Sequence, residues 1–203
     1  MPSGRGYTPS TPSESPFRAT AYPQNDSLMR VLGIDPGSTV TGFGVVDAAR
    51  GRLVHIHSGC IRTHSATPIA ERLTVIHAGL LAVIDEHHPE AIAIEAIFHH
   101  KSAESALRLG QARGVALLAA GQRGFSPSEY NNQTVKASVG AHGRADKDAV
   151  AKMVAMLLGT KFSGPADVTD ALAIAITHCA FARTAVLRAP LRPPPPASKG
   201  TEA

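Results

Sequence analysis

The pattern of apolar and polar positions predicts a sheet that begins near residue 29. An apolar run over 31–34 ends at Asp35, and a turn over 36–38 leads to a second β-rich run over 41–46. Runs rich in Val and Ile that are joined by Pro and Gly are typical of a β-hairpin. The unbroken apolar run indicates that the first strand is buried on both faces. A third run, LVHIHSGCIRT over 53–63, extends the sheet.

The pattern then changes to a helical period. Apolar residues recur every three or four positions from about Pro68, which predicts a helix; they are Leu73, Ile76, Leu80, Leu81 and Ile84. The run EAIAIEAIF reads as a buried fourth strand that ends at Glu95. Further elements are a helix over 102–121, a fifth strand near 125–130, a helix over 146–158 and a last helix from Pro165. This order predicts an α/β fold, a mixed five-stranded sheet with helices on both faces.

The length of 203 residues fits one domain. Residues 1–28 are rich in Pro, Ser and Thr without an apolar period, and are expected to be a disordered tail or a mis-assigned start, since Met29 directly precedes the first strand. The domain is expected over 29–182, followed by a Pro-rich tail over 183–203. Two cysteines and no apolar run of membrane-spanning length favour a reduced, cytoplasmic location.

Asp35 is the first residue that points to chemistry. A carboxylate at the end of a buried strand is costly unless a basic group or a metal ion faces it. Gly33, Gly37, Gly42 and Gly44 remove side chains around it, so a backbone or a ligand can approach closely. The alternative is a tight hairpin with a capped, solvated Asp.

Three further acids complete a candidate site. Glu95 ends the fourth strand, and Asp167 and Asp170 share one face of the last helix because they are three residues apart. Asp167 alone could merely stabilise the helix dipole. Four carboxylates repel one another unless cations hold them, and oxygen donors suit Mg²⁺ or Mn²⁺. Two such ions about 3.5–4 Å apart would activate a water and stabilise the leaving oxygen of a phosphodiester.

The motifs LGIDPGSTVTGFGVVD, SGCIRT, IEAIF, SALRLGQARGVALLAA and DALAIAITH, in this order, resemble the RuvC family of bacterial Holliday-junction resolvases. The resemblance covers about residues 29–181. It implies a ribonuclease H-like fold, with Asp35, Glu95, Asp167 and Asp170 as catalytic acids that bind magnesium. It also implies a homodimer that cuts two opposed strands of a four-way DNA junction, leaving 5′-phosphate ends, and that works with the RuvA and RuvB branch-migration complex.

Basic and aromatic positions add candidate DNA contacts. Lys136 and Lys147 match basic positions that the family uses on DNA, and Arg144 can join them in neutralising phosphates. Phe98 is either a core residue or an aromatic that stacks on a DNA base, and the resemblance favours stacking. The chain departs from the family at Ala96, where a polar residue often follows the strand-four acid, and at Ser102, where the family has Asn; neither position is a metal ligand.

Three other functions fit parts of this pattern. An actin-like ATPase has a similar phosphate loop, but it needs a second lobe that 203 residues cannot supply. A junction-binding module without activity is disfavoured because all four acids are present. A ribonuclease H-like enzyme that acts on RNA is disfavoured only by the resemblance.

Overall fold

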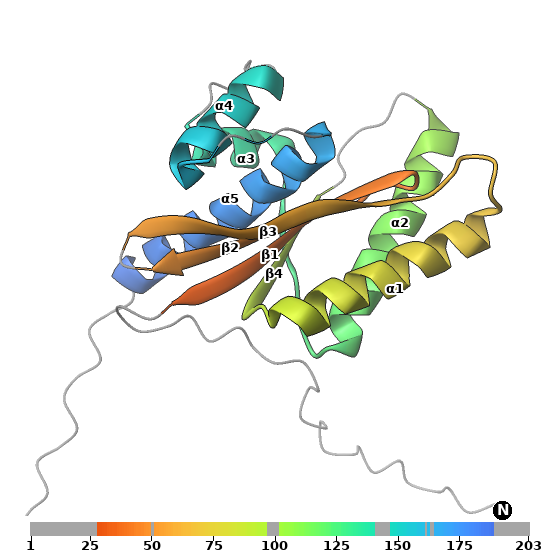
Figure 1. The fold of residues 1–203 in the computed structure, drawn as a ribbon, viewed down its shortest axis with the longest axis horizontal. Coiled ribbons are helices and arrows are strands. Elements are labelled where there is room, and N and C mark those ends of the chain that lie inside the picture. The colour runs from red at the N-terminus through yellow and green to blue at the C-terminus, as the bar shows by residue number, and fades with distance from the viewer. Residues whose placement is uncertain are drawn as a thin grey trace, which may run out of the picture.

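The computed structural model describes residues 28–49, 51–96, 102–140, 147–160, 162 and 165–188 (Figure 1). These residues form a five-stranded mixed sheet with the strand order β3-β2-β1-β4-β5, which confirms the predicted α/β class. The strands are β1 (Met29–Asp35), β2 (Val40–Ala49), β3 (Arg52–Arg62), β4 (Ala91–Glu95) and β5 (Ser128–Tyr130).

β1 lies at the centre of the sheet, as its apolar sequence predicts. It pairs antiparallel with β2 to form the expected hairpin, and parallel with β4 on its other edge. The register sets Gly33 opposite Gly44, and Ile34 next to Ile94 of β4. Side chains of paired residues point to the same face of a sheet. The two strands that end in acids are therefore direct neighbours.

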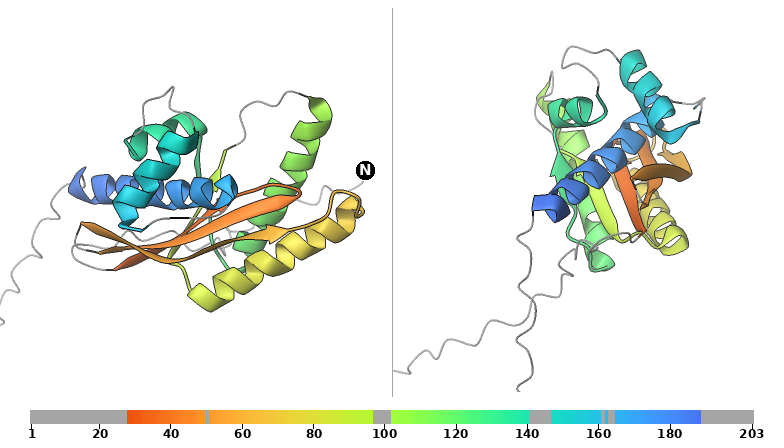
Figure 2. Two further views of the ribbon diagram at one scale, coloured as in Figure 1. Left: turned by 45° about the horizontal axis from the view of Figure 1, so that its top comes forward. Right: turned by 90° about the vertical axis from the view of Figure 1, so that its left-hand side faces the viewer.

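Helices cover both faces of the sheet. α1 (Ile69–His87) and α2 (Ala103–Gln122) lie on one face, and α5 (Ala166–Arg188) crosses the other, with α3 (Asn132–Ser138) and α4 (Lys147–Leu158) outside α5 (Figures 1 and 2). None of the described helices is long and apolar enough to cross a bilayer.

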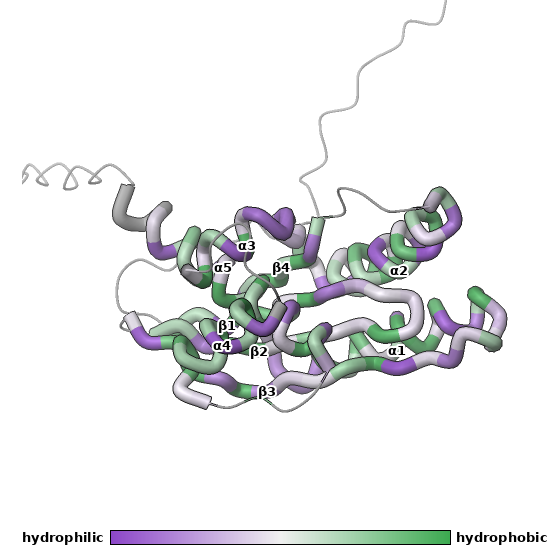
Figure 3. The backbone as a smooth tube through the Cα atoms, turned by 90° about the horizontal axis from the view of Figure 1, so that it is seen from above, coloured by the Kyte–Doolittle hydropathy of each residue, from purple (hydrophilic) through white to green (hydrophobic). Residues whose placement is uncertain are grey.

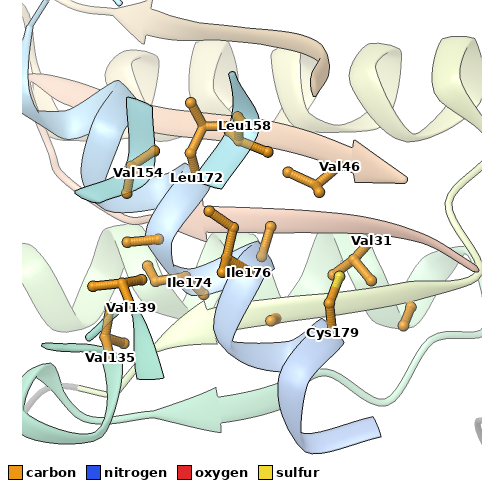
Figure 4. Packing of buried hydrophobic residues seen from close by; sticks show 14 of the residues in the cluster. Val31, Val46, Val135, Val139, Val154, Leu158, Leu172, Ile174, Ile176 and Cys179 are labelled. Carbon is orange, nitrogen blue, oxygen red and sulfur yellow. The ribbon is translucent and has the colours of Figure 1, made fainter. Parts of the chain in front are cut away.

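Two apolar clusters fill the space between these layers. Leu32 and Ile34 of β1 pack with α1 and α2, whereas Val31 packs with α5 and the helices outside it. Figure 4 shows the second cluster, in which Leu172 and Ile176 of α5 meet side chains from β1, β2, α3 and α4. Hydrophobic positions are concentrated where α5 and β4 meet (Figure 3). The alternation along β1 thus decides which residues face α5.

Two elements differ from the sequence-based prediction. The polar segment after β5 contains the short helix α3, which begins because Asn131 Oδ1 accepts a hydrogen bond of 2.8 Å from the Thr134 amide. α5 continues to Arg188, beyond the predicted domain end at residue 182. No proline interrupts the helix before Pro190, and Ala182 is buried in the core. The expected tails otherwise lie outside the described residues.

Candidate active site

Glycines on β1 and β2 let α5 approach the sheet closely. A Cβ on Gly33 would lie 2.1 Å from the carbonyl oxygen of Ala171, and a Cβ on Gly42 would lie 2.0 Å from that of Asp167. Real side chains never come so near a backbone atom, so only glycine fits at either position. The close approach anticipated around Asp35 is therefore made by the backbone of α5.

Strand pairing places Asp35 and Glu95 on the face that α5 covers. Asp35 follows Gly33 by two residues, so both point towards α5, and Asp35 pairs with Gly42. Glu95 follows Ala93, which belongs to the cluster under α5. Since Ile34 pairs with Ile94, the two acids stand side by side at the ends of β1 and β4. The two strands therefore pair, which is the condition for both carboxylates to face one pocket.

α5 brings the other two acids to the same place. Burial raises the pKa of Asp35 to about 9, reinforced by the charge of Glu95, by a hydrogen bond with Glu95, and by the charges of Asp170 and Asp167. The geometry agrees, because Asp167 lies against Gly42, the strand partner of Asp35, and Asp170 lines one hollow with Glu95. The alternative of a solvated Asp35 is therefore wrong: this carboxyl is largely buried and surrounded by like charges.

A hollow of about 90 Å³ opens beside these acids. Glu95 and Asp170 form one part of its wall, and Asn132 and Lys136 of α3 form another. The remaining lining is apolar and consists of Val135, Val150 and Ile174. Asn132 and Lys136 are one helical turn apart and share a face. The hollow thus joins two acidic groups to a cation, an arrangement that suits a phosphate bound through metal ions and Lys136.

Comparison with known proteins agrees with this site. A family model described as crossover junction endodeoxyribonuclease RuvC matches residues 31–178. The chain belongs to the RuvC family. RuvC of Myxococcus xanthus is 49% identical over 160 residues, covering 78% of this chain and 84% of that protein. RuvC of Geobacter sulfurreducens is 46% identical over 164 residues, with 81% and 98% covered.

Solved structures place the fold in the same family. The structure of Thermus thermophilus RuvC in complex with a Holliday junction substrate has a TM-score of 0.73 and 40% identity, covering 78% of this chain and 97% of that one. The yeast mitochondrial Holliday junction resolvase Ydc2 has a TM-score of 0.56 at 13% identity, covering 80% and 82%, which shows a shared fold. The fold is the ribonuclease H-like fold of RuvC, as the motifs implied.

The donor atoms of the site fit the metal ions that the resemblance to RuvC implies. The four side chains offer only carboxylate oxygens, which magnesium and manganese prefer. Burial raises the pKa of Asp35 and the charges of the other three acids raise it further, and either a proton or a cation relieves this unfavourable charge. In the described part of the chain, no three His, Cys, Asp or Glu side chains form a ready-made ligand set. Asp35, Glu95, Asp167 and Asp170 are the residues that would hold such ions.

The predicted DNA contacts are only partly described. Lys136 lies in the hollow. Lys147 is the first residue of α4, but its side chain is outside the described part, as are Phe98 and Arg144 altogether. His178 of α5 is a buried core residue. Its Nδ1 lies 3.0 Å from the Tyr130 hydroxyl, and burial lowers its pKa to about 4.

Asn132 is the residue of the site that sequence reasoning missed. The polar segment QTVKASVG after β5 gave no periodic apolar pattern, so no helix was predicted there. The signal that could have found it is local. An Asn131 cap followed by Val135 and Val139, four residues apart, indicates a helix that carries Asn132 and Lys136 on one face.

The raised pKa of Asp35 predicts how stability depends on pH. Because its folded-state pKa lies far above the value of about 4 in unfolded chains, protonated Asp35 favours folding. This contribution is fully present below pH 4 and is lost as the pH rises towards 9. In a chelator, the melting temperature should fall between pH 5 and 9, and Asp35→Asn should weaken that dependence. Added Mg²⁺ should restore stability at pH 8–9. An Asp35→Asn profile identical to that of the wild type would contradict this assignment.

Proposed function

We propose that this protein is a Holliday-junction endonuclease that hydrolyses one phosphodiester bond in each of two opposed DNA strands and leaves 5′-phosphate ends. The observation that carries the proposal is the convergence of Asp35, Glu95, Asp167 and Asp170 at one end of the sheet. Membership of the RuvC family supports four-way junctions as the substrate, since a relative's structure contains one. The activity serves DNA recombination and repair.

Asp35, Glu95, Asp167 and Asp170 would hold two magnesium ions, with manganese as a substitute. The bound ions supply an activated water and charge stabilisation of the leaving oxygen. Asp35 and Glu95 lie at the ends of two paired strands. The hydrogen bonds of the sheet would hold both carboxylates in place beside the scissile phosphate. Asp167 and Asp170 would complete the site from α5. This helix lies close to the sheet because the glycines of β1 and β2 have no side chains. Asp35 must lose its proton when cations bind, so activity should increase with pH until this is complete.

The proposal is tested by comparing Mg²⁺-dependent cleavage of a four-way junction, the matching linear duplex and an RNA–DNA hybrid. Paired nicks in opposed strands of the junction, with little cleavage of the other two substrates, are expected. Preferential cleavage of the hybrid would instead support a ribonuclease. ATP turnover without DNA would support the actin-like alternative.

DNA would reach the site over α3 and the segments next to it. Lys136 lies in the hollow beside Glu95, where it can neutralise a phosphate adjacent to the scissile one. We extend this role to Lys147 and Arg144, which follow Lys136 in the chain. Phe98, three residues after Glu95, would stack on a base that the junction leaves partly unpaired. These contacts position the strand while the acids act on it.

The exposed side of α2 supports a homodimer. Leu107, Gly110, Gly114 and Leu118 follow one face of this helix at spacings of three and four residues. Leu107 is 64% exposed and Leu118 is 53% exposed, and nothing lies within 4 Å of a Cβ on either glycine. The buried face of α2 is instead a row of alanines. The glycine face is therefore not core, and it can pack against the same face of a second copy. Two such active sites would serve two opposed strands.

Leu107→Glu should convert the protein to a monomer. At a two-fold interface this substitution would bury two unpaired charges, one from each subunit. The exposed Leu107 contributes little to the fold of one subunit, so folding should be retained. Sedimentation at micromolar concentration should show half the wild-type mass with folding retained. Val75→Glu, at an exposed apolar position of α1, is the matched control and should remain a dimer. A monomeric wild type that still makes paired nicks would refute the dimer.

A fragment over residues 29–188 should carry the whole activity. It spans every described helix and strand, including the part of α5 beyond residue 182. Its melting temperature and junction nicking should match those of the full chain, because the flanking segments lack an apolar period. A fall of many degrees would show that a flanking segment docks on the domain.

In the cytoplasm the protein would act with the RuvA and RuvB branch-migration complex.

A further inference from the structure

Arg72 is a buried cation that the proposed chemistry does not use. It lies on α1, is only 3% exposed, and makes no ion pair with a carboxylate among the described residues. Its guanidinium instead donates to one backbone carbonyl, that of Ser38: Nε at 2.9 Å, and Nη2 as well. Burial of a guanidinium costs free energy unless it is paired, so this charge requires an explanation.

The Ser38 carbonyl lies in the loop that follows Asp35, and it is held by three donors. In addition to the two bonds from Arg72, the Thr63 hydroxyl donates to it at 2.7 Å. The Thr63 amide donates to the next carbonyl, that of Thr39, at 2.9 Å. On the other side of the loop, the buried Thr41 hydroxyl donates to the Gly37 carbonyl at 2.7 Å. The path of the loop from Asp35 to β2 is thus fixed at three successive carbonyls.

This arrangement determines where the next N–H points. In a trans peptide the carbonyl and the following N–H point in opposite directions, and the described residues contain no cis peptide bond. With the Ser38 carbonyl turned inward to Arg72, the Thr39 N–H points away from α1. Thr39 is exposed, and its N–H donates to no group in the described part of the chain. Charge-assisted bonds to the carbonyl polarise this peptide and strengthen its outward donor.

We propose that the Ser38–Thr39 peptide is a phosphate-binding element, in which Arg72 and Thr63 hold the carbonyl so that the Thr39 N–H donates to a backbone phosphate of the DNA. Four residues of chain span at most about 14 Å, so this phosphate is within a few nucleotides of the bond next to Asp35. Backbone N–H groups commonly bind phosphates and fix the register of a protein on DNA. Arg72 is a positioning residue. The bound phosphate would supply the negative charge that is missing around the Arg72 guanidinium. The inference rests on the proposed nuclease function.

A methylphosphonate scan of the junction tests this contact. Each phosphate near the cleavage position is replaced in turn by a neutral methylphosphonate, and nicking is measured with Mg²⁺ at saturating enzyme. Wild type should slow about tenfold or more at one phosphate outside the scissile position, as expected for loss of a charge-assisted hydrogen bond. Thr39→Pro, which removes the N–H, should nick the unmodified junction about tenfold more slowly and show no further loss at that phosphate. Thr39→Ala keeps the N–H and should retain the wild-type response.

Arg72→Lys provides a second variant with an intact loop sequence. Lysine retains the charge but cannot hold one carbonyl with two nitrogens, so the response at the same phosphate should weaken in the folded variant. Variants that melt normally and respond like wild type at every phosphate would overturn the inference. If wild type fails to nick the unmodified junction at all, the proposed function itself is wrong, and this inference with it.

Discussion

Asp170→Asn should reduce junction nicking in Mg²⁺ by at least about a hundredfold while binding of the junction remains nearly unchanged. Asp170 lines the hollow with Glu95, and its charge helps to raise the pKa of Asp35, so it lies within the acid cluster. Mutation of groups that merely support metal ligands costs about ten- to a hundredfold, and a ligand itself should cost more. Asparagine keeps the size of the side chain and the helix.

Two measurements separate binding from chemistry in this variant. Gel shifts in Ca²⁺ report junction affinity, and nicking in Mg²⁺ reports hydrolysis. Removal of one negative charge slightly reduces repulsion of DNA, so affinity should not fall. Asp85→Asn is a matched control, because Asp85 pairs with Arg123 on the exposed side of α1, far from the acids in the fold. It should nick at the wild-type rate. Wild-type nicking by Asp170→Asn would remove this residue from the metal site.

The two strand acids were predictable from sequence because β-strands impose a strict alternation. The apolar runs before Asp35 and Glu95 identify buried strands, and neighbouring strand ends in an α/β sheet form sites. What the runs could not reveal is the register. Only the pairing of Ile34 with Ile94 shows that the two acids are adjacent and not offset by a residue, which would move one to the opposite face.

The features that sequence reasoning missed are one short helix and one contact between distant segments. α3 has only seven residues, of which Val135 alone is buried, so its helical period was not recognised, and Asn132 was missed with it. Arg72 lies on the buried face of α1, four residues before Ile76, but its charge makes burial unexpected from the sequence. Its burial follows from the loop after β1, which folds over it and supplies the Ser38 carbonyl. The Asn131 cap is a local signal for α3, whereas nothing local indicates the role of Arg72.

Gly42→Ala should both destabilise the protein and impair nicking, because Gly42 is where β2 touches the start of α5. The added Cβ would lie 2.0 Å from the Asp167 carbonyl oxygen and 3.1 Å from the Asp167 Cβ. Neither atom is the end of a flexible side chain, so the first turn of α5 must move away from the sheet. Insertion of a methyl group into a tightly packed site costs about 1–3 kcal/mol of unfolding free energy.

The displacement also carries Asp167 and Asp170 away from Asp35, and a shift of about 1 Å can reduce catalysis about a hundredfold. Gly59→Ala on β3 is the matched control, because the three atoms nearest to its Cβ all belong to the side chain of Phe43 and none to the backbone of α5. That variant should lose less stability and keep nicking. Chemical unfolding and single-turnover nicking distinguish the two effects. If folded Gly42→Ala nicks at the wild-type rate, the acids do not depend on the approach of α5 at this point, and the placement of Asp167 in the site is wrong.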